Sequence, residues 1–185
     1  MRIIAGEYSS RKIEAPKGSN TRPTLDKVRE AVFSSLGTYF DGGVFLDLYA
    51  GSGANGFEAL SRGMDKAIFV DSSRDAIRVI KKNAETLQCQ DRCTILAMKD
   101  KKALGLLEEE GQKFDLVYLD PPYARQTNDE ILKYLGDHHM MNKDGRIMIE
   151  SAKEDSFLKE YNDIKLYKEA VYGITRISYY RYEGE

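Results

Sequence analysis

From residue 44 onward, short apolar runs alternate with segments of helical periodicity, and this alternation constrains the fold more than any other feature of the chain. The order is typical of βαβ units, in which crossover helices join parallel strands. The expected core strands are residues 44–48, 67–70, 94–98, 116–119 and 146–149, separated by helices such as residues 74–87. The sequence therefore predicts a doubly wound α/β sheet.

The two ends of the chain depart from this rhythm. Residues 164–172 and 175–182 are rich in β-forming side chains and meet at Gly173, which predicts an antiparallel hairpin at the edge of a mixed sheet. Before the core, residues 2–8 and 12–15 flank a short polar stretch and predict a small β-hairpin.

Positive charge is concentrated in an N-terminal extension, residues 1–37, which ends with an expected helix over residues 25–36 capped by Thr24. The extension contains seven basic and four acidic residues, whereas the core domain, residues 38–185, contains 21 basic and 26 acidic residues. This asymmetry fits an arm that contacts the phosphates of a nucleic acid. Taken alone, the charges fit an ordinary solvated surface equally well.

Several classes of protein are disfavoured by the composition. There is no long apolar run and no hydrophobic N-terminal segment, so we expect a cytoplasmic protein that does not enter a membrane. Cys89 and Cys93 have no second ligand pair nearby, and His138 and His139 lack the spacing of metal ligands. We therefore expect no metal site.

A glycine-rich loop follows the first expected strand, with glycines at 51, 53 and 56 that allow a sharp turn and a close approach to a ligand. Asp71 ends the second strand twenty residues after Gly51, where its carboxylate can accept hydrogen bonds from both hydroxyls of a ribose. Asp47, just before the loop, suits a ligand with an ammonium and a sulfonium better than a pyrophosphate. The pattern favours S-adenosylmethionine over a ligand-free turn in which Asp71 merely caps a helix. The candidate cofactor contacts are Asp47, Tyr49, Ala50, Gly51, Gly53, Asp71, Ser72 and Asp100.

The fourth expected strand runs into Asp120-Pro121-Pro122-Tyr123, the candidate catalytic residues. An aromatic exocyclic amine is a poor nucleophile, because its lone pair is delocalised into the ring. The Asp120 carboxylate and the Pro121 carbonyl can each accept one N–H and aim the emerging lone pair at a sulfonium methyl group. The prolines restrict the backbone that presents this carbonyl, and Tyr123 offers a face on which an extruded base can stack. The tetrapeptide predicts methylation of an amino group on a base.

These motifs, with others along the chain, resemble the RsmD-type family of 16S rRNA guanine-N2 methyltransferases. The matching segments are Met1-Arg2-Ile3-Ile4-Ala5-Gly6, Thr21-Arg22-Pro23-Thr24 with Lys27-Val28-Arg29-Glu30, residues 47–56, residues 120–123 and Tyr172-Gly173. The resemblance implies a Rossmann-like class I methyltransferase fold with a seven-stranded mixed sheet and an N-terminal hairpin and helix extension. It also implies S-adenosylmethionine as methyl donor and a guanine N2 in 16S rRNA, within an assembling small ribosomal subunit, as acceptor.

Carried over residue by residue, the resemblance also proposes contacts with rRNA and shows one departure from the family. The candidate rRNA contacts are Arg11, Lys12, Arg22, Lys27 and Arg29. Where such proteins usually carry Asp followed by Ala after the third strand, this chain has Lys99 followed by Asp100. Three readings remain here: Asp100 contacts the adenine, a backbone amide does so, or Asp100 caps the helix that follows.

Three other functions share part of the pattern. A DNA adenine-N6 methyltransferase would use the same tetrapeptide and cofactor, but such enzymes usually carry a larger recognition domain than the short extension here. An NAD-dependent oxidoreductase would keep the glycine loop and leave Asp47 and the tetrapeptide without a role. A non-catalytic RNA-binding assembly factor would not need the intact tetrapeptide.

Overall fold

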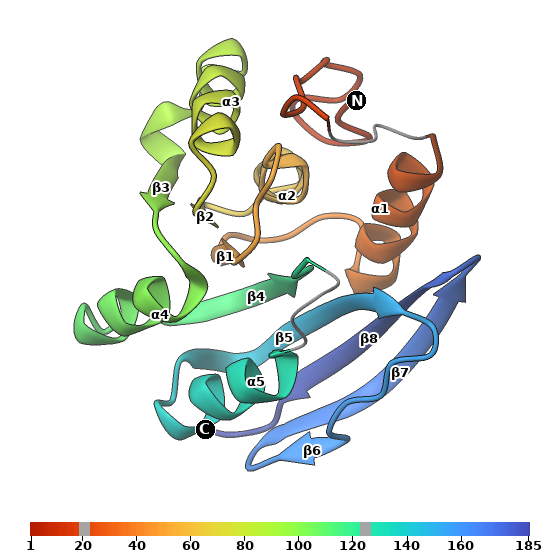
Figure 1. Ribbon diagram of the computed structural model, residues 1–185, viewed down its shortest axis with the longest axis vertical. Coiled ribbons are helices and arrows are strands. Elements are labelled where there is room, and N and C mark those ends of the chain that lie inside the picture. The colour runs from red at the N-terminus through yellow and green to blue at the C-terminus, as the bar shows by residue number, and fades with distance from the viewer. Residues whose placement is uncertain (19–22, 123–126) are drawn as a thin grey trace. The chain divides into compact units, whose positions relative to one another are not determined.

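Three parallel strands form the sheet of the first compact unit, Met1–Ala103, in the order β3-β2-β1 (Figure 1). The structure, a computed structural model, describes residues 1–18, 23–122 and 127–185. The strands are β1 (Val44–Asp47), β2 (Lys66–Asp71) and β3 (Cys93–Ala97), joined by the helices α2 (Ala54–Ser61) and α3 (Arg74–Thr86) and the 3-10 turn η1 (Gln90–Arg92). Each strand begins and ends within one residue of its expected bounds. Buried apolar side chains dominate β1 and β2, whereas β3, at the end of the strand order, is half-buried.

The N-terminal segment lies against α2. Arg2 and Lys12 form a single antiparallel bridge, to which the expected hairpin is reduced. Instead of pairing across a hairpin, the Tyr8 amide donates to Ser61 Oγ at 2.9 Å. Gly6 permits this close approach, because its φ is +88° and a Cβ atom there would lie 1.9 Å from the Ser61 carbonyl oxygen. Tertiary contacts with α2 therefore take backbone donors that strand pairing would have used.

A buried carboxylate on α2 ties this segment to the neighbouring helices. Glu58 is fully buried and accepts hydrogen bonds from the amides of Ile4, at 2.8 Å, and Ala5, at 3.1 Å. Its carboxylate also pairs with Arg62 Nε at 3.0 Å and with Arg29 Nε at 3.4 Å. Glu58 thus holds the start of the chain through backbone donors and balances two buried guanidinium groups.

Helix α1 (Pro23–Leu36) begins two residues earlier than expected. Proline is favoured at the first position of a helix, where its missing N–H has no intrahelical acceptor. Thr24, the expected N-cap, therefore lies within the first turn of the helix. Helix α4 (Asp100–Glu109) begins at Asp100, just after β3.

The second compact unit, Leu104–Glu185, contains a mixed sheet in the order β4-β5-β8-β7-β6. Its elements are β4 (Phe114–Leu119), α5 (Asn128–Asp137), β5 (Met141–Ala152), β6 (Glu160–Tyr161), β7 (Ile164–Tyr172) and β8 (Thr175–Tyr182). Strands β4 and β5 are parallel, whereas β5 pairs antiparallel with β8 and β8 with β7. The C-terminal hairpin has the bounds expected from the sequence. The described residues contain eight strands where seven were expected, because the two-residue β6 adds to the edge.

Strand β5 extends well beyond its expected bounds at both ends. Its pairing with β8 continues to Ala152, opposite Thr175, so the residues after Ile149 remain part of the sheet. This extension places Glu150 and Ser151 on a hydrogen-bonded strand. Within the residues that the structure describes, no helix has both the length and the apolar character needed to span a membrane.

Candidate functional site

The glycine loop of the first unit has the backbone conformations that its sequence predicts. Gly51 and Gly53 adopt φ angles of +57° and +83°, which side chains disfavour. A Cβ atom on Gly51 would meet no atom within 4 Å, so the backbone at this residue borders open space. Gly53 is the N-cap of α2, and its amide donates to the Ala50 carbonyl at 2.8 Å.

Gly56 allows α2 to pack closely on β2. A Cβ atom at this position would lie 2.3 Å from Cε1 of Phe69, a buried residue of β2. Phe57 also packs on this ring, with centroids 4.8 Å apart. The third glycine therefore serves helix-to-sheet packing, as expected for its position in such loops.

Two carboxylates flank the loop, at the ends of neighbouring parallel strands. Asp47 ends β1 and is 1% exposed, whereas Asp71 ends β2 and is partly exposed. Asp71 Oδ2 accepts from the Gly51 amide at 2.9 Å, and its Oδ1 accepts from the Ser73 amide at 2.9 Å. Each oxygen retains a lone pair for another donor. Asp71 thus orders the loop while its carboxylate keeps the capacity to bind a ligand hydroxyl; the next residue, Ser72, is exposed.

Asp100 is engaged by two groups of its own unit. The Tyr49 hydroxyl donates to Asp100 Oδ2 at 2.7 Å, and the Lys101 amide lies 2.8 Å from Oδ1. Asp100 is the first residue of α4, and this position agrees with a role in stabilising the N-terminus of that helix. The Tyr49 contact was not expected from the sequence and links the glycine loop to this turn. Whether Asp100 or a backbone amide contacts an adenine stays a prediction.

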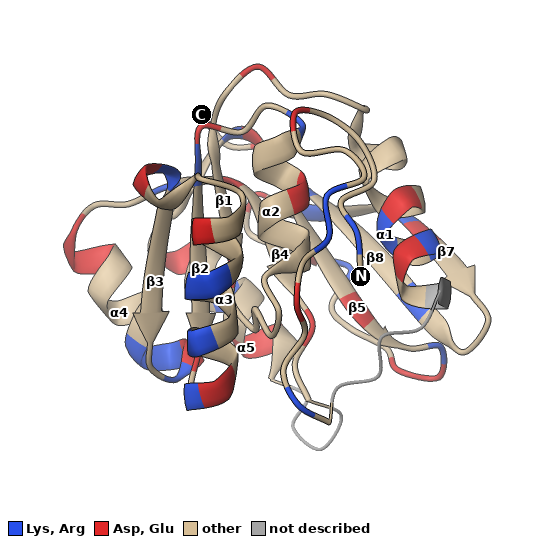
Figure 2. Ribbon diagram, turned by 90° about the horizontal axis from the view of Figure 1, so that it is seen from above, with Lys and Arg blue, Asp and Glu red and all other residues tan. Residues whose placement is uncertain are grey.

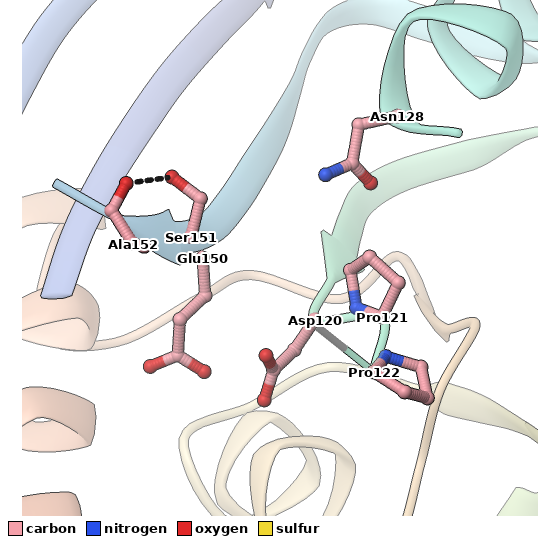
Figure 3. Close-up of a pocket in the computed structure, with 7 residues that line it drawn as sticks. All are labelled: Asp120, Pro121, Pro122, Asn128, Glu150, Ser151 and Ala152. Carbon is pink, nitrogen blue, oxygen red and sulfur yellow. Dashed lines mark hydrogen bonds between the residues drawn. The ribbon is translucent and has the colours of Figure 1, made fainter. Parts of the chain in front are cut away.

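In the second unit, the described residues of the tetrapeptide follow β4 and border a small pocket (Figure 3). Asp120, Pro121 and Pro122 line it from this turn, and Tyr123 lies outside the described residues. The opposite wall comes from the end of β5 and the start of α5. Its residues are Asn128, Glu150, Ser151 and Ala152.

The carboxylates of Asp120 and Glu150 face one another across this pocket (Figure 3). Asp120 is exposed to solvent, but protein atoms also surround its carboxyl group. This partial removal from water raises the pKa of the Asp120 carboxyl above its ordinary value. Hydrogen bonding with Glu150 acts in the opposite direction, toward a lower pKa for Asp120. Two carboxyl groups that interact so closely favour a state in which one proton is held between them.

Asn128, the first residue of α5, contributes a buried amide to the same pocket. The residue is 1% exposed, and its side chain is directed toward the turn of Asp120 and Pro121 (Figure 3). Among the described residues, no hydrogen-bond donor reaches its Oδ1 atom. A buried acceptor without a donor is unfavourable, so this oxygen is suited to bind an N–H group of a ligand.

Sequence reasoning missed Glu150 and Asn128. A signal for Glu150 was available, because it directly follows the apolar run of residues 146–149 just as Asp120 follows residues 116–119. The carboxyl ends of parallel strands meet at one edge of a sheet, where ligands bind. Asn128 carried no comparable signal, since its burial depends on how α5 packs.

The candidate phosphate contacts differ in exposure. Arg11, Lys12 and Lys27 are exposed, and Arg22 lies outside the described residues. Arg29 contradicts the expectation, because it is 4% exposed and its guanidinium pairs with Asp26 and Glu58. Helix α1 carries two acidic and two basic residues, whereas α3 carries four basic and two acidic residues (Figure 2). The exposed basic residues of α3 therefore recur at helical spacing, although Arg78 pairs with Asp75 and Lys82 with Glu14.

Comparison with known proteins places the whole chain in one family. The model of the family described as Conserved hypothetical protein 95 matches residues 1–181. The Bacillus subtilis protein YlbH is 37% identical over 184 residues, with 100% of both chains covered. Ribosomal RNA small subunit methyltransferase D of Escherichia coli is 31% identical over 185 residues, covering 100% of this chain and 90% of that protein. The solved structure of Escherichia coli yhhF is 30% identical, with a TM-score of 0.83 over 100% of this chain and 99% of that one.

Proposed function

The chain belongs to the RsmD family, and on this premise we propose that it transfers a methyl group from S-adenosylmethionine to the exocyclic N2 amine of a guanine in 16S rRNA. The acceptor would be an assembling small ribosomal subunit, which places the reaction in the cytoplasm. The fold is that of a class I methyltransferase, as the sequence predicted. The relative named ribosomal RNA small subunit methyltransferase D supports rRNA methylation as the general activity.

The residues around the glycine loop fit S-adenosylmethionine. The buried Asp47 carboxylate suits a cationic ligand, Asp71 retains lone pairs for ribose hydroxyls, and Gly51 borders open space. When bound, this cofactor supplies an electrophilic methyl group on a sulfonium. Tyr49, Ala50, Gly53, Ser72 and Asp100 complete the proposed contacts.

The observation that carries the proposal is the position of Asp120 and the two prolines beside a pocket at the carboxyl end of β4. In the proposed reaction, the Asp120 carboxylate and the Pro121 carbonyl each accept an N–H of the target amine. These contacts favour a tetrahedral nitrogen whose lone pair can attack. A bond forms between N2 and the methyl carbon while the bond from that carbon to sulfur breaks, leaving a thioether. The proton lost by the nitrogen passes to the Asp120 carboxylate, whose raised pKa suits it to receive a proton.

The exposed basic residues of the N-terminal extension are the proposed rRNA contacts. Arg11, Lys12 and Lys27 can reach solvent, and each can neutralise a phosphate. The contacts of Gly6 and Glu58 attach the start of the chain to α2 and would thereby hold the basic residues of the extension in place.

The test is transfer of radiolabelled methyl groups to small subunits from a strain that lacks this protein, followed by mass spectrometry of the nucleosides. We expect label in N2-methylguanosine. Asp120→Ala should abolish transfer and leave the affinity for S-adenosylmethionine largely unchanged, since the proposed contacts with this cofactor all belong to the first unit. Asp41→Ala, at an exposed position, is the matched control and should methylate as the wild type does.

Three outcomes would overturn the proposal. Label in DNA adenine, with none in rRNA, would support a DNA adenine-N6 methyltransferase. Cofactor binding without transfer to any subunit particle would support a non-catalytic assembly factor. An Asp120→Ala variant with the wild-type rate would remove the amine-binding role of this residue.

A further inference from the structure

We infer that Glu150 selects guanine as the methylated base by accepting the N1–H hydrogen bond beside the amine that Asp120 holds. The inference rests on the proposed function and extends it to a residue that the tetrapeptide does not contain. The tetrapeptide alone suits the exocyclic amine of any base, and a contact from Glu150 to N1–H would explain why guanine is the base that is methylated.

The register of the sheet places Glu150 next to Asp120. Leu119 of β4 pairs with Ile149 of β5 in parallel, and the two acidic residues directly follow this pair. Glu150 is further fixed by pairing with Ile177 on β8, so its backbone belongs to a strand bonded on both sides. Figure 3 shows both carboxylates directed into the same pocket. A base whose amine binds Asp120 would therefore present a neighbouring ring atom to Glu150.

That neighbouring ring atom differs between the bases. In guanine, the N2 amine is flanked by N1–H, a hydrogen-bond donor. In adenine and cytosine, the amine is flanked on the corresponding side by a ring nitrogen with a lone pair. A carboxylate accepts from N1–H but is repelled by such a lone pair, which would also remain unpaired. Glu150 therefore favours guanine by attraction and disfavours the other two bases by repulsion.

The other polar groups of the pocket support the same base. The buried Asn128 Oδ1 accepts from none of the described residues and offers an alternative to the Pro121 carbonyl as acceptor for the second amine hydrogen. The Ser151 hydroxyl, which could donate, is directed to the Ala152 carbonyl at 3.2 Å. The described side chains that line the pocket thus present mainly hydrogen-bond acceptors. Guanine brings three adjacent N–H groups on this edge, whereas adenine and cytosine bring only the two of the amine.

The interaction between the two carboxyl groups fits the exchange that guanine binding requires. Two interacting carboxyl groups favour a state with one shared proton, which would satisfy Asp120 and Glu150 while the site is free. On binding, that proton would leave to solvent and the N–H groups of guanine would take its place, with N1–H at Glu150 and an amine hydrogen at Asp120. Adenine offers no hydrogen for Glu150, so the pair would not be satisfied in this way.

The experiment compares wild type, Glu150→Gln and Glu150→Ala on two kinds of small subunit. One carries the target guanosine mapped with the wild-type protein, and the other carries adenosine at that position. Glu150→Ala should lower kcat/KM on guanosine by roughly 10- to 150-fold, the range for a hydrogen bond to a charged group. Glu150→Gln should narrow the preference for guanosine over adenosine by about 10-fold or more, because its amide can also donate to adenine N1.

Controls separate this role from folding and from the proposed function. Glu154→Gln makes the same chemical change at an exposed position near the end of β5 and should keep the wild-type preference. Affinity for S-adenosylmethionine and the thermal melting curve check that each variant is folded. If Glu150→Gln keeps the wild-type ratio of guanosine to adenosine methylation, the inference is wrong. If the wild type forms no N2-methylguanosine, the proposed function itself fails.

Discussion

Replacing Glu58 by alanine should destabilise the protein strongly, although this residue lies outside both parts of the candidate site. The substitution removes a fully buried carboxylate that pairs with Arg62 at 3.0 Å and Arg29 at 3.4 Å. It also removes the acceptor for the amides of Ile4 and Ala5. The buried Arg62 would lose its carboxylate partner, Arg29 would keep Asp26, and the start of the chain would lose hydrogen bonds that attach it to α2.

The size of the expected loss of stability depends on which hydrogen-bond and ion-pair partners Arg29 and Arg62 keep after the substitution. Breaking a buried ion pair by removing one member costs about 3–5 kcal/mol. Arg29 retains Asp26 and the Arg2 carbonyl, and Arg62 retains the Thr38 carbonyl, so the two pairs do not contribute fully and separately. We therefore expect a total loss of about 3–5 kcal/mol, against a typical stability of about 5–15 kcal/mol. The midpoint of urea unfolding should fall by about 1–2 M.

The assay is urea unfolding at 25 °C, followed by circular dichroism, with limited proteolysis as a second measurement. Cleavage near Arg2, Arg11 or Lys12 should accelerate in Glu58→Ala, because the N-terminal segment is no longer held. Glu85→Ala removes an exposed glutamate from α3 and should change stability by no more than about 0.5 kcal/mol. A Glu58→Ala variant within about 1 kcal/mol of wild type would refute the assignment of this carboxylate as the anchor.

Two further predictions concern the backbone and the pH dependence. Gly6→Ala should destabilise the protein by about 2–4 kcal/mol, because the new Cβ atom would meet the Ser61 carbonyl and the φ angle of +88° disfavours a side chain; an unchanged thermal midpoint would contradict this. Because burial raises the pKa of Asp120 and the proposed reaction needs its ionised form, kcat/KM should fall with decreasing pH at values above those at which an ordinary aspartate titrates. An acid limb of the kcat/KM profile at a pKa of about 3.9, the ordinary value for aspartate, would contradict this prediction.

The elements that the sequence alone predicted well depend on local patterns. The core strands, α3 and the C-terminal hairpin follow from apolar runs, helical periodicity and the turn at Gly173. The glycine loop also follows from sequence, since positive φ at Gly51 and Gly53 is a property of the backbone at those residues. The tetrapeptide predicted its chemistry through residue type and order, and the structure places its described residues at the end of β4.

What only the tertiary structure decided involves residues far apart in the chain. The register of β4 with β5 brings Glu150 to Asp120, and the packing of α5 buries Asn128. Burial likewise turns Arg29 from a candidate phosphate contact into a partner of Glu58. Strand register and burial arise from the free energy of the whole packed chain. A pattern read within a short window therefore identifies the acidic and basic residues, while the folded structure decides which of them meet a ligand and which meet each other.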